Sequence, residues 1–128
     1  MKKLLLGLTL LMTATTASAE WAKSAGNDEV DIYVDRATIR RTGNFVKMWD
    51  LTDFNAVQTV AGDSYFSSKA LSEYDCKEEK TRLIVFSWFS GKMGGGKGVF
   101  SDSDPSNWRP VSPRSLDEIQ WKIACGKK

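Results

Sequence analysis

Histidine is absent from the 128 residues of this chain, and only two cysteines and three prolines are present. The absence of histidine removes the commonest general base, metal ligand and haem ligand at once. A Ser-His-Asp triad cannot form, so we expect no enzymatic activity. The polar loop that begins at Asp102 lacks the glycine and the glutamate that an EF-hand calcium loop requires at its sixth and twelfth positions. The sequence therefore predicts neither a metal site nor a cofactor.

Long apolar runs are also missing after the first nineteen residues, so we predict no transmembrane segment there. Two lysines precede a Leu-rich stretch from Leu4 to Leu11, and the small residues Ala17-Ser18-Ala19 follow, which is typical of a signal peptide cleaved after Ala19. No cysteine near this position could accept a lipid, so a lipoprotein is not indicated. We expect residues 1–19 to be a signal peptide and residues 20–128 to form one periplasmic or secreted domain.

Neither sign of charge is in excess once the two signal lysines are removed, because 16 basic and 16 acidic residues remain. A domain without net charge lacks the electrostatic footprint of a nucleic-acid-binding protein. The charges are divided unevenly, however, with a net charge of −5 over residues 20–79 and +5 over residues 80–128. The basic residues of the second half either gather on one side of the fold or are neutralised by antiparallel pairing with the acidic half.

A gathered basic patch is suited to an acidic glycan, a lipid head group or an acidic protein surface. Its members are Lys92, Lys97, Arg109 and Arg114, with Met93 and Trp108 beside them.

Alternation of apolar and polar residues with a period of two predicts most of the domain to be β-strand. The charged segment Lys77–Lys80 reads as a turn, which joins its two neighbouring strands into an antiparallel hairpin. The expected strands are Asp31–Asp35, Phe45–Phe54, Ser67–Cys76, Thr81–Phe89 and Lys97–Ser101, with Trp21 on a strand before them.

One segment near the C-terminus has the period of a helix instead. Ser115 and Glu118 have the spacing of a capping box, and an apolar stripe of Leu116, Ile119 and Ile123 follows. Gly126 favours a left-handed end to this helix. The pattern predicts an α+β fold, in which a C-terminal α-helix packs on one face of a single antiparallel β-sheet of five to six strands.

The two cysteines, Cys76 and Cys125, are most simply explained as one disulfide in an oxidising compartment. Closing a loop of this length would stabilise the fold by about 4 kcal/mol on the chain-entropy model. A catalytic or metal-binding thiol would need a histidine or a nearby second cysteine, and the sequence provides neither.

The glycine-rich segment Gly91–Gly98 matches the pattern G-x-x-x-x-G-K of a phosphate-binding loop. That loop also needs Ser or Thr after the lysine and a helix behind it, whereas position 98 is glycine and Val99-Phe100-Ser101 reads as strand. We therefore interpret the segment as a flexible hairpin loop that carries two lysines.

Several motifs occur in an order that resembles the surface-adhesin protein E-like domain family of Gram-negative bacteria. The resemblance extends from about Trp21 to Gly126. Its motifs are Glu73-Tyr74-Asp75-Cys76, Ser90-Gly91-Lys92-Met93-Gly94, Trp108-Arg109-Pro110-Val111 and the terminal Cys125.

This resemblance implies an antiparallel sheet with a C-terminal helix, a Cys76–Cys125 bridge and a non-catalytic binding module. Some members of the family are adhesins that bind host extracellular-matrix proteins, and haem binding by a dimer has been attributed to the namesake, so the resemblance allows a dimer. We take as candidate binding residues Lys92, Met93, Lys97, Trp108 and Arg109. The alternative hypothesis is a periplasmic inhibitor of a cell-wall hydrolase such as lysozyme, with the lysine-bearing loop entering an acidic cleft.

Overall fold

The computed structural model describes residues 19–128, so the predicted signal peptide lies outside the described residues except for its last one. The described chain folds as a seven-stranded antiparallel sheet followed by one helix, which confirms the α+β prediction. The elements are β1 (Ala22–Gly26), β2 (Val30–Thr42), β3 (Phe45–Val60), β4 (Asp63–Asp75), β5 (Lys80–Phe89), the short 3₁₀ turn η1 (Lys92–Gly94), β6 (Gly98–Asp102), β7 (Arg109–Pro110) and α1 (Leu116–Cys125).

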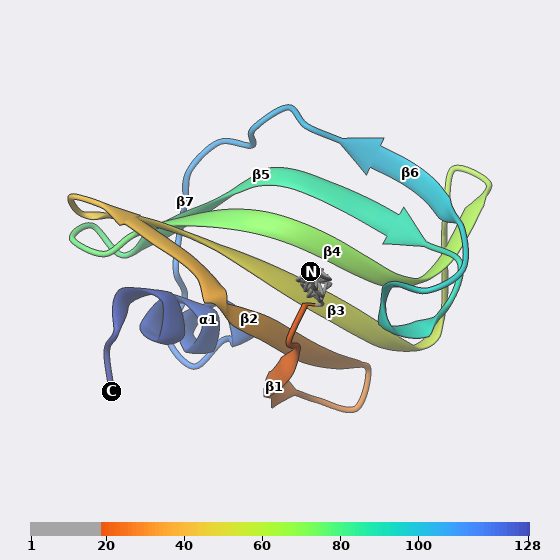
Figure 1. Cartoon of the computed structure of the whole chain (residues 1–128), viewed down its shortest axis with the longest axis horizontal. Coiled ribbons are helices and arrows are strands. Elements are labelled where there is room, and N and C mark those ends of the chain that lie inside the picture. Colours follow the sequence, from red (N-terminus) through yellow and green to blue (C-terminus); the bar gives the residue numbers. More distant parts are fainter. Residues whose placement is uncertain (1–18) are drawn as a thin grey trace, which may run out of the picture.

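Strands β1 to β6 follow one another in the sheet in chain order, and β7 pairs with the start of β5 (Figure 1). β3 and β4 are longer than predicted, since both continue past an irregularity after Asp53 to a tight hairpin turn at Ala61-Gly62. The two-residue β7 is too short to produce a periodic pattern. The predicted hairpin between Ser67–Cys76 and Thr81–Phe89 is present as β4 and β5.

The ends of α1 are set by the residues that the sequence indicated. Ser115 Oγ accepts a hydrogen bond of 3.1 Å from the backbone N–H of Glu118, and Gly126 has a φ of +67°. The Glu118 carboxylate does not complete a capping box. It lies 3.3 Å from Lys122 Nζ, one turn further along the helix.

The buried face of α1 differs from the predicted stripe of Leu116, Ile119 and Ile123. Ile119 is exposed, and the other two are only partly buried. The prediction was wrong because it left out Trp121 and Cys125, whose links to the end of β4 turn their own face of the helix inward. The buried residues of the helix are Gln120, Trp121, Ala124 and Cys125.

Two links fasten the helix to the end of β4. Cys76 and Cys125 form the predicted disulfide, with 5.6 Å between their Cα atoms. Trp121 Nε1 donates a hydrogen bond of 3.0 Å to the carbonyl oxygen of Asp75. The main core gathers around these links and consists of Val34, Val46, Met48, Tyr74, Trp121, Ala124 and Cys125.

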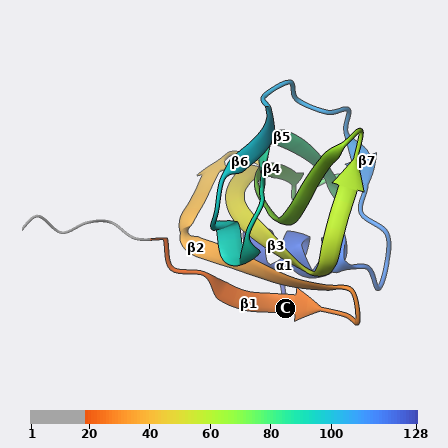
Figure 2. The same cartoon turned by 90° about the vertical axis from the view of Figure 1, so that its right-hand side faces the viewer.

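The helix is too short to cover the whole sheet face on which it packs. Ten residues of α-helix span about 15 Å, whereas thirteen residues of strand such as β4 span about 43 Å. The sheet curls around the helix, and the part of the concave face beyond it carries no helix (Figure 2). In residues 19–128 no helix has the length and apolar character needed to cross a membrane.

Candidate functional site

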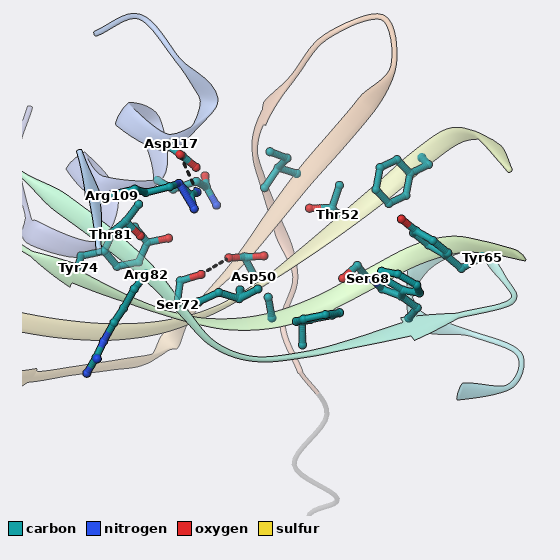
Figure 3. A pocket seen from close by; sticks show the side chains of 17 residues that line it. Asp50, Thr52, Tyr65, Ser68, Ser72, Tyr74, Thr81, Arg82, Arg109 and Asp117 are labelled. Carbon is teal, nitrogen blue, oxygen red and sulfur yellow. Dashed lines mark hydrogen bonds and ion pairs between the residues drawn. The ribbon is translucent and has the colours of Figure 1, made fainter. Parts of the chain in front are cut away.

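A cavity of about 400 Å³ lies on the concave face, next to α1 and floored by β3, β4 and β5 (Figure 3). It exists because three consecutive inward positions of β4 carry the small residues Ser68, Ala70 and Ser72. Residues that pair across antiparallel strands project to the same face. Ala70 lies between Asp50 and Phe86 in such a cross-strand row, so a carboxylate and an aromatic ring flank a position with almost no side chain.

A register shift in the β4–β5 pairing changes which side chains of β5 point inward. Leu71 pairs with Val85 and Ser72 with Leu83, so Ile84 is left without a partner residue on β4. The extra residue interrupts the alternation of inward and outward side chains along β5. As a result Leu83 and Phe86, three positions apart, both line the cavity. β5 therefore forms an apolar wall on this side.

The two ends of the cavity differ in polarity. Tyr65 and Trp88 stack at 4.3 Å between ring centroids, and Phe54 packs edge-on against Tyr65 at 5.6 Å. Phe86 extends this aromatic end at 5.7 Å from Trp88. The polar end, nearer α1, contains Asp50, Ser72, Tyr74, Thr81, Arg82, Arg109, Asp117 and Gln120.

Asp50 is the carboxylate nearest the floor of the cavity. Its Oδ2 accepts a hydrogen bond of 3.4 Å from Ser72 Oγ. Burial raises the pKa of the Asp50 carboxyl to about 7, the negative charge of Asp117 adds to the rise, and the Ser72 hydrogen bond opposes it. Burial likewise raises the pKa of Tyr74, which keeps its phenol neutral.

Two arginines at the polar end are already paired with carboxylates. Arg109 Nη2 lies 2.7 Å from Asp117 Oδ2, and Arg82 Nη2 lies 2.7 Å from Glu73 Oε1. Both positive charges are therefore largely neutralised within the fold.

The glycine-rich loop lies on the opposite face of the sheet, where hydrogen bonds hold it against β3 and β4. Ser67 Oγ donates to the carbonyl oxygen of Gly91 at 2.7 Å and accepts from the N–H of Gly94 at 2.8 Å. Lys92 Nζ lies 3.2 Å from Asp53 Oδ2, and Asp53 Oδ1 accepts from the N–H of Met93 at 2.8 Å. The interpretation of this segment as a flexible loop was wrong, because buried side chains of two strands fix its backbone.

Of the two arrangements that the sequence left open, a single basic patch that joins Lys92 and Lys97 to Arg109 does not form. Arg109 pairs with Thr81 at the start of β5, whereas Lys97 hydrogen-bonds through its carbonyl to Ser90, nine residues further along. At about 3.3 Å per residue, about 30 Å separates the two positions. Among the candidate residues, Lys92, Met93 and Lys97 thus lie at one end of the sheet, while Trp108 and Arg109 lie at the other.

Trp108 lies half-buried at the β7 end. Its ring packs against Phe45 at 5.7 Å between centroids, and the Arg82 guanidinium lies 4.7 Å from its centroid. Of the five candidate residues, Arg109 alone lines the cavity.

Sequence reasoning missed Asp50 and Gln120, two polar residues that line the cavity. Asp50 has the same parity along β3 as the apolar residues Val46, Met48 and Phe54. This shared parity was the one sign in the sequence that the Asp50 side chain points inward. Gln120 precedes Trp121, and a helix face centred on the tryptophan would have included it.

The cavity has an apolar wall and a few polar groups at one end, which is a composition typical of small-molecule sites. Residues 19–128 contain no group of three or more acidic or cysteine side chains placed to hold a metal ion.

Comparison with known proteins identifies the same fold. The sequence model of the surface-adhesin protein E family matches residues 21–126. The structure of Haemophilus influenzae protein E superimposes with a TM-score of 0.64 at 12% identity, covering 88% of each chain. The crystal structure of protein E from non-typeable Haemophilus influenzae gives a TM-score of 0.62 at 12% identity, covering 88% of this chain and 79% of that one. No curated protein matches the sequence.

Proposed function

The chain belongs to the surface-adhesin protein E family, and we propose that it is an extracytoplasmic binding protein without enzymatic activity. Its proposed partner is a host extracellular-matrix protein, an acidic glycan or another envelope component. The observation that carries this proposal is the family match, which spans nearly all of the described residues. The family is one of adhesins and is generally non-catalytic.

The Cys76–Cys125 disulfide supports the extracytoplasmic location. Disulfides persist in oxidising compartments such as the periplasm and the cell exterior, and they are rare in the cytosol. The signal peptide predicted over residues 1–19 agrees with this location, and a chain released after Ala19 without a lipid would be periplasmic or secreted.

The exposed surface best suited to an acidic or mixed partner is the loop around η1. The Met93 side chain is 40% exposed, and Lys97 is exposed and makes no ion pair with residues 19–128. Because the loop backbone is fixed to the sheet, these side chains are presented with little loss of backbone entropy on binding.

The test is a binding panel of immobilised matrix proteins, heparin and lipopolysaccharide, probed with the processed chain. We expect binding to at least one surface, and weaker binding by a Met93→Ala, Lys97→Ala double variant. Lys127→Ala, which removes an exposed lysine after the end of α1, is the matched control and should bind as wild type. No binding across the panel would contradict the adhesive function.

The hypothesis of a hydrolase inhibitor depends on fewer free lysines in the loop than the sequence suggested. Lys92 bonds to Asp53 and to the carbonyl oxygen of Phe54, which leaves Lys97 as the lysine of the loop that makes no ion pair with residues 19–128. A lysozyme assay belongs in the same panel, since unchanged lysis rates at micromolar protein would exclude this function.

A further inference from the structure

No cationic side chain of residues 19–128 forms an ion pair with the Asp50 carboxylate. Its cross-strand neighbours on the concave face are Val34 and Ala70, and Phe86 lies beyond Ala70. The Ser72 hydroxyl, at 3.4 Å, is its only side-chain hydrogen-bond donor in residues 19–128, and Asp50 belongs to no ion pair there. An ionised carboxylate in such surroundings is poorly solvated and poorly paired.

The positive charges nearby do not compensate it. Arg109 is held by Asp117 and Arg82 by Glu73, each at 2.7 Å. Among residues 19–128 the Asp50 carboxylate therefore has no ion-pair partner, although Arg82 and Arg109 are among the residues that line the cavity.

Gln120 provides an independent sign of a missing partner. The residue is 4% exposed and lines the same cavity. Its Oε1 accepts a hydrogen bond of 2.6 Å from Ser24 Oγ, whereas its Nε2 has no partner among the described residues. A buried donor without a partner costs about 1–3 kcal/mol, so a ligand atom that accepts from Nε2 would gain that stabilisation.

The rest of the cavity is apolar and large enough for an aromatic ring. Phe86 and Trp88 form the β5 wall, and the volume of about 400 Å³ lies within the range of small-molecule sites. Aromatic faces also favour a neighbouring cation through their quadrupoles.

We propose that this cavity binds a small organic amine, with the ammonium group on the Asp50 carboxylate, the apolar body against Phe86 and Trp88, and a hydrogen-bond acceptor of the ligand at Gln120 Nε2. This inference goes beyond the adhesive function, because the cavity lies on the opposite face of the sheet from the exposed loop around η1.

The proposal is tested first on the wild-type domain with ligands that differ only in charge. Phenethylamine carries the ammonium and an aromatic body, and 2-phenylethanol has the same shape without the charge. Titration calorimetry at pH 8 should give an affinity at least tenfold higher for the amine. The methyl group of Ala70, at the floor of the cavity, should show nuclear Overhauser contacts to the phenyl protons of the amine.

The variant Asp50→Asn keeps the shape of the side chain and cannot ionise. It should weaken phenethylamine binding at least tenfold and leave 2-phenylethanol binding unchanged. Asp104→Asn removes an equal charge from an exposed turn outside the cavity, and it should bind the amine as wild type.

The affinity for the amine should also rise with pH. The titratable groups that line the cavity with Asp50 are Tyr74 from β4, Arg109 from β7 and Asp117 from α1. Arg109 is paired with Asp117, and the Arg82 side chain of β5 points away from the cavity to Glu73 (Figure 3). With the pKa of Asp50 at about 7, its ionised fraction increases about tenfold between pH 6 and pH 8, while the amine stays protonated. We expect a similar increase in affinity.

Equal affinities for phenethylamine and 2-phenylethanol would overturn the proposal, as would wild-type affinity in Asp50→Asn. The absence of amine binding at millimolar concentration would also overturn it. The comparison of the two ligands on the wild-type domain needs no variant. The proposal can therefore be refuted even if Asp50→Asn fails to fold.

Discussion

Trp121 donates its indole N–H to the carbonyl oxygen of Asp75 at 3.0 Å, one residue before the cysteine that bridges to Cys125. The hydrogen bond and the disulfide therefore fasten the last turns of α1 to one corner of the sheet. A helix of ten residues fixed at that corner cannot reach the other half of the concave face. This placement leaves room on the concave face, and the small residues Ser68, Ala70 and Ser72 of β4 make that room the cavity around Asp50.

The disulfide should supply a large part of the stability. Replacing Cys76 and Cys125 by serine should lower the free energy of unfolding by about 4 kcal/mol, because the bridge closes a loop of 49 residues in the unfolded chain. Urea denaturation of the variant and of the oxidised wild type measures the difference. Reduced wild type should match the variant, and a denaturation midpoint unaffected by reduction would contradict this expectation.

The N-terminus of α1 depends on a single side-chain cap. Ser115→Ala removes the acceptor for the Glu118 N–H and should lower the free energy of unfolding by about 1 kcal/mol. Ser112→Ala is the matched control, since only the backbone carbonyl of Ser112 takes part in the hydrogen bonds of this turn. Equal stabilities of the two variants, measured by denaturation, would show that the cap contributes nothing.

The glycine-rich loop should be sensitive to substitution at one glycine and tolerant at another. Gly96 has a φ of +73°, and a Cβ there would lie 2.3 Å from Ser90 Oγ. We expect Gly96→Ala to destabilise the domain by about 1–2 kcal/mol or more. At Gly98 a Cβ meets nothing within 4 Å, so Gly98→Ala should change stability by less than about 0.5 kcal/mol. Equal effects of the two substitutions on the denaturation midpoint would contradict the described loop conformation.

Ionisation of Asp50 should oppose folding. Its pKa is about 7 in the folded chain against 3.8 for the unperturbed group, so the folded state retains a proton that the unfolded state has lost. The contribution of Asp50 to stability should therefore fall as pH rises from about 4 to 7, by up to about 1.4 kcal/mol per pH unit. Above this window Asp50→Asn should be more stable than wild type.

The measurement for this prediction is the free energy of unfolding of wild type and Asp50→Asn at several pH values. The difference between the two isolates the aspartate from the other titrating groups. Asp104→Asn should show the pH dependence of wild type. A wild-type minus Asp50→Asn difference that does not vary with pH would contradict the prediction.

Local pattern was sufficient to predict the elements whose signals lie within a few residues. The turn Lys77–Lys80, the strand Thr81–Phe89 and the end of the helix at Gly126 are all where the sequence placed them, within a residue or two. The disulfide followed from the number of cysteines and from the expected compartment. These features depend on alternation, capping or composition, which the sequence displays directly.

The site could not be predicted in the same way because it depends on contacts between distant segments. The hydrogen bond from Trp121 of α1 to Asp75 at the end of β4 sets which face of the helix is buried. Gln120 lies on that face, and a search for apolar residues does not find it. Asp50 was overlooked because an acid within an alternating strand is normally assigned to the solvent side. The separation of Lys97 from Arg109 depends on strand pairing, which hydrophobic periodicity does not specify.

A short, tethered helix leaves the Asp50 carboxylate lining a cavity in which no cationic side chain of residues 19–128 pairs with it. The most direct test is a pH titration of the ¹³C carboxyl resonance of Asp50 in the ligand-free domain, assigned by comparison with Asp50→Asn. We predict a titration midpoint near 7. A midpoint near 4, the value of a hydrated aspartate, would contradict the claim.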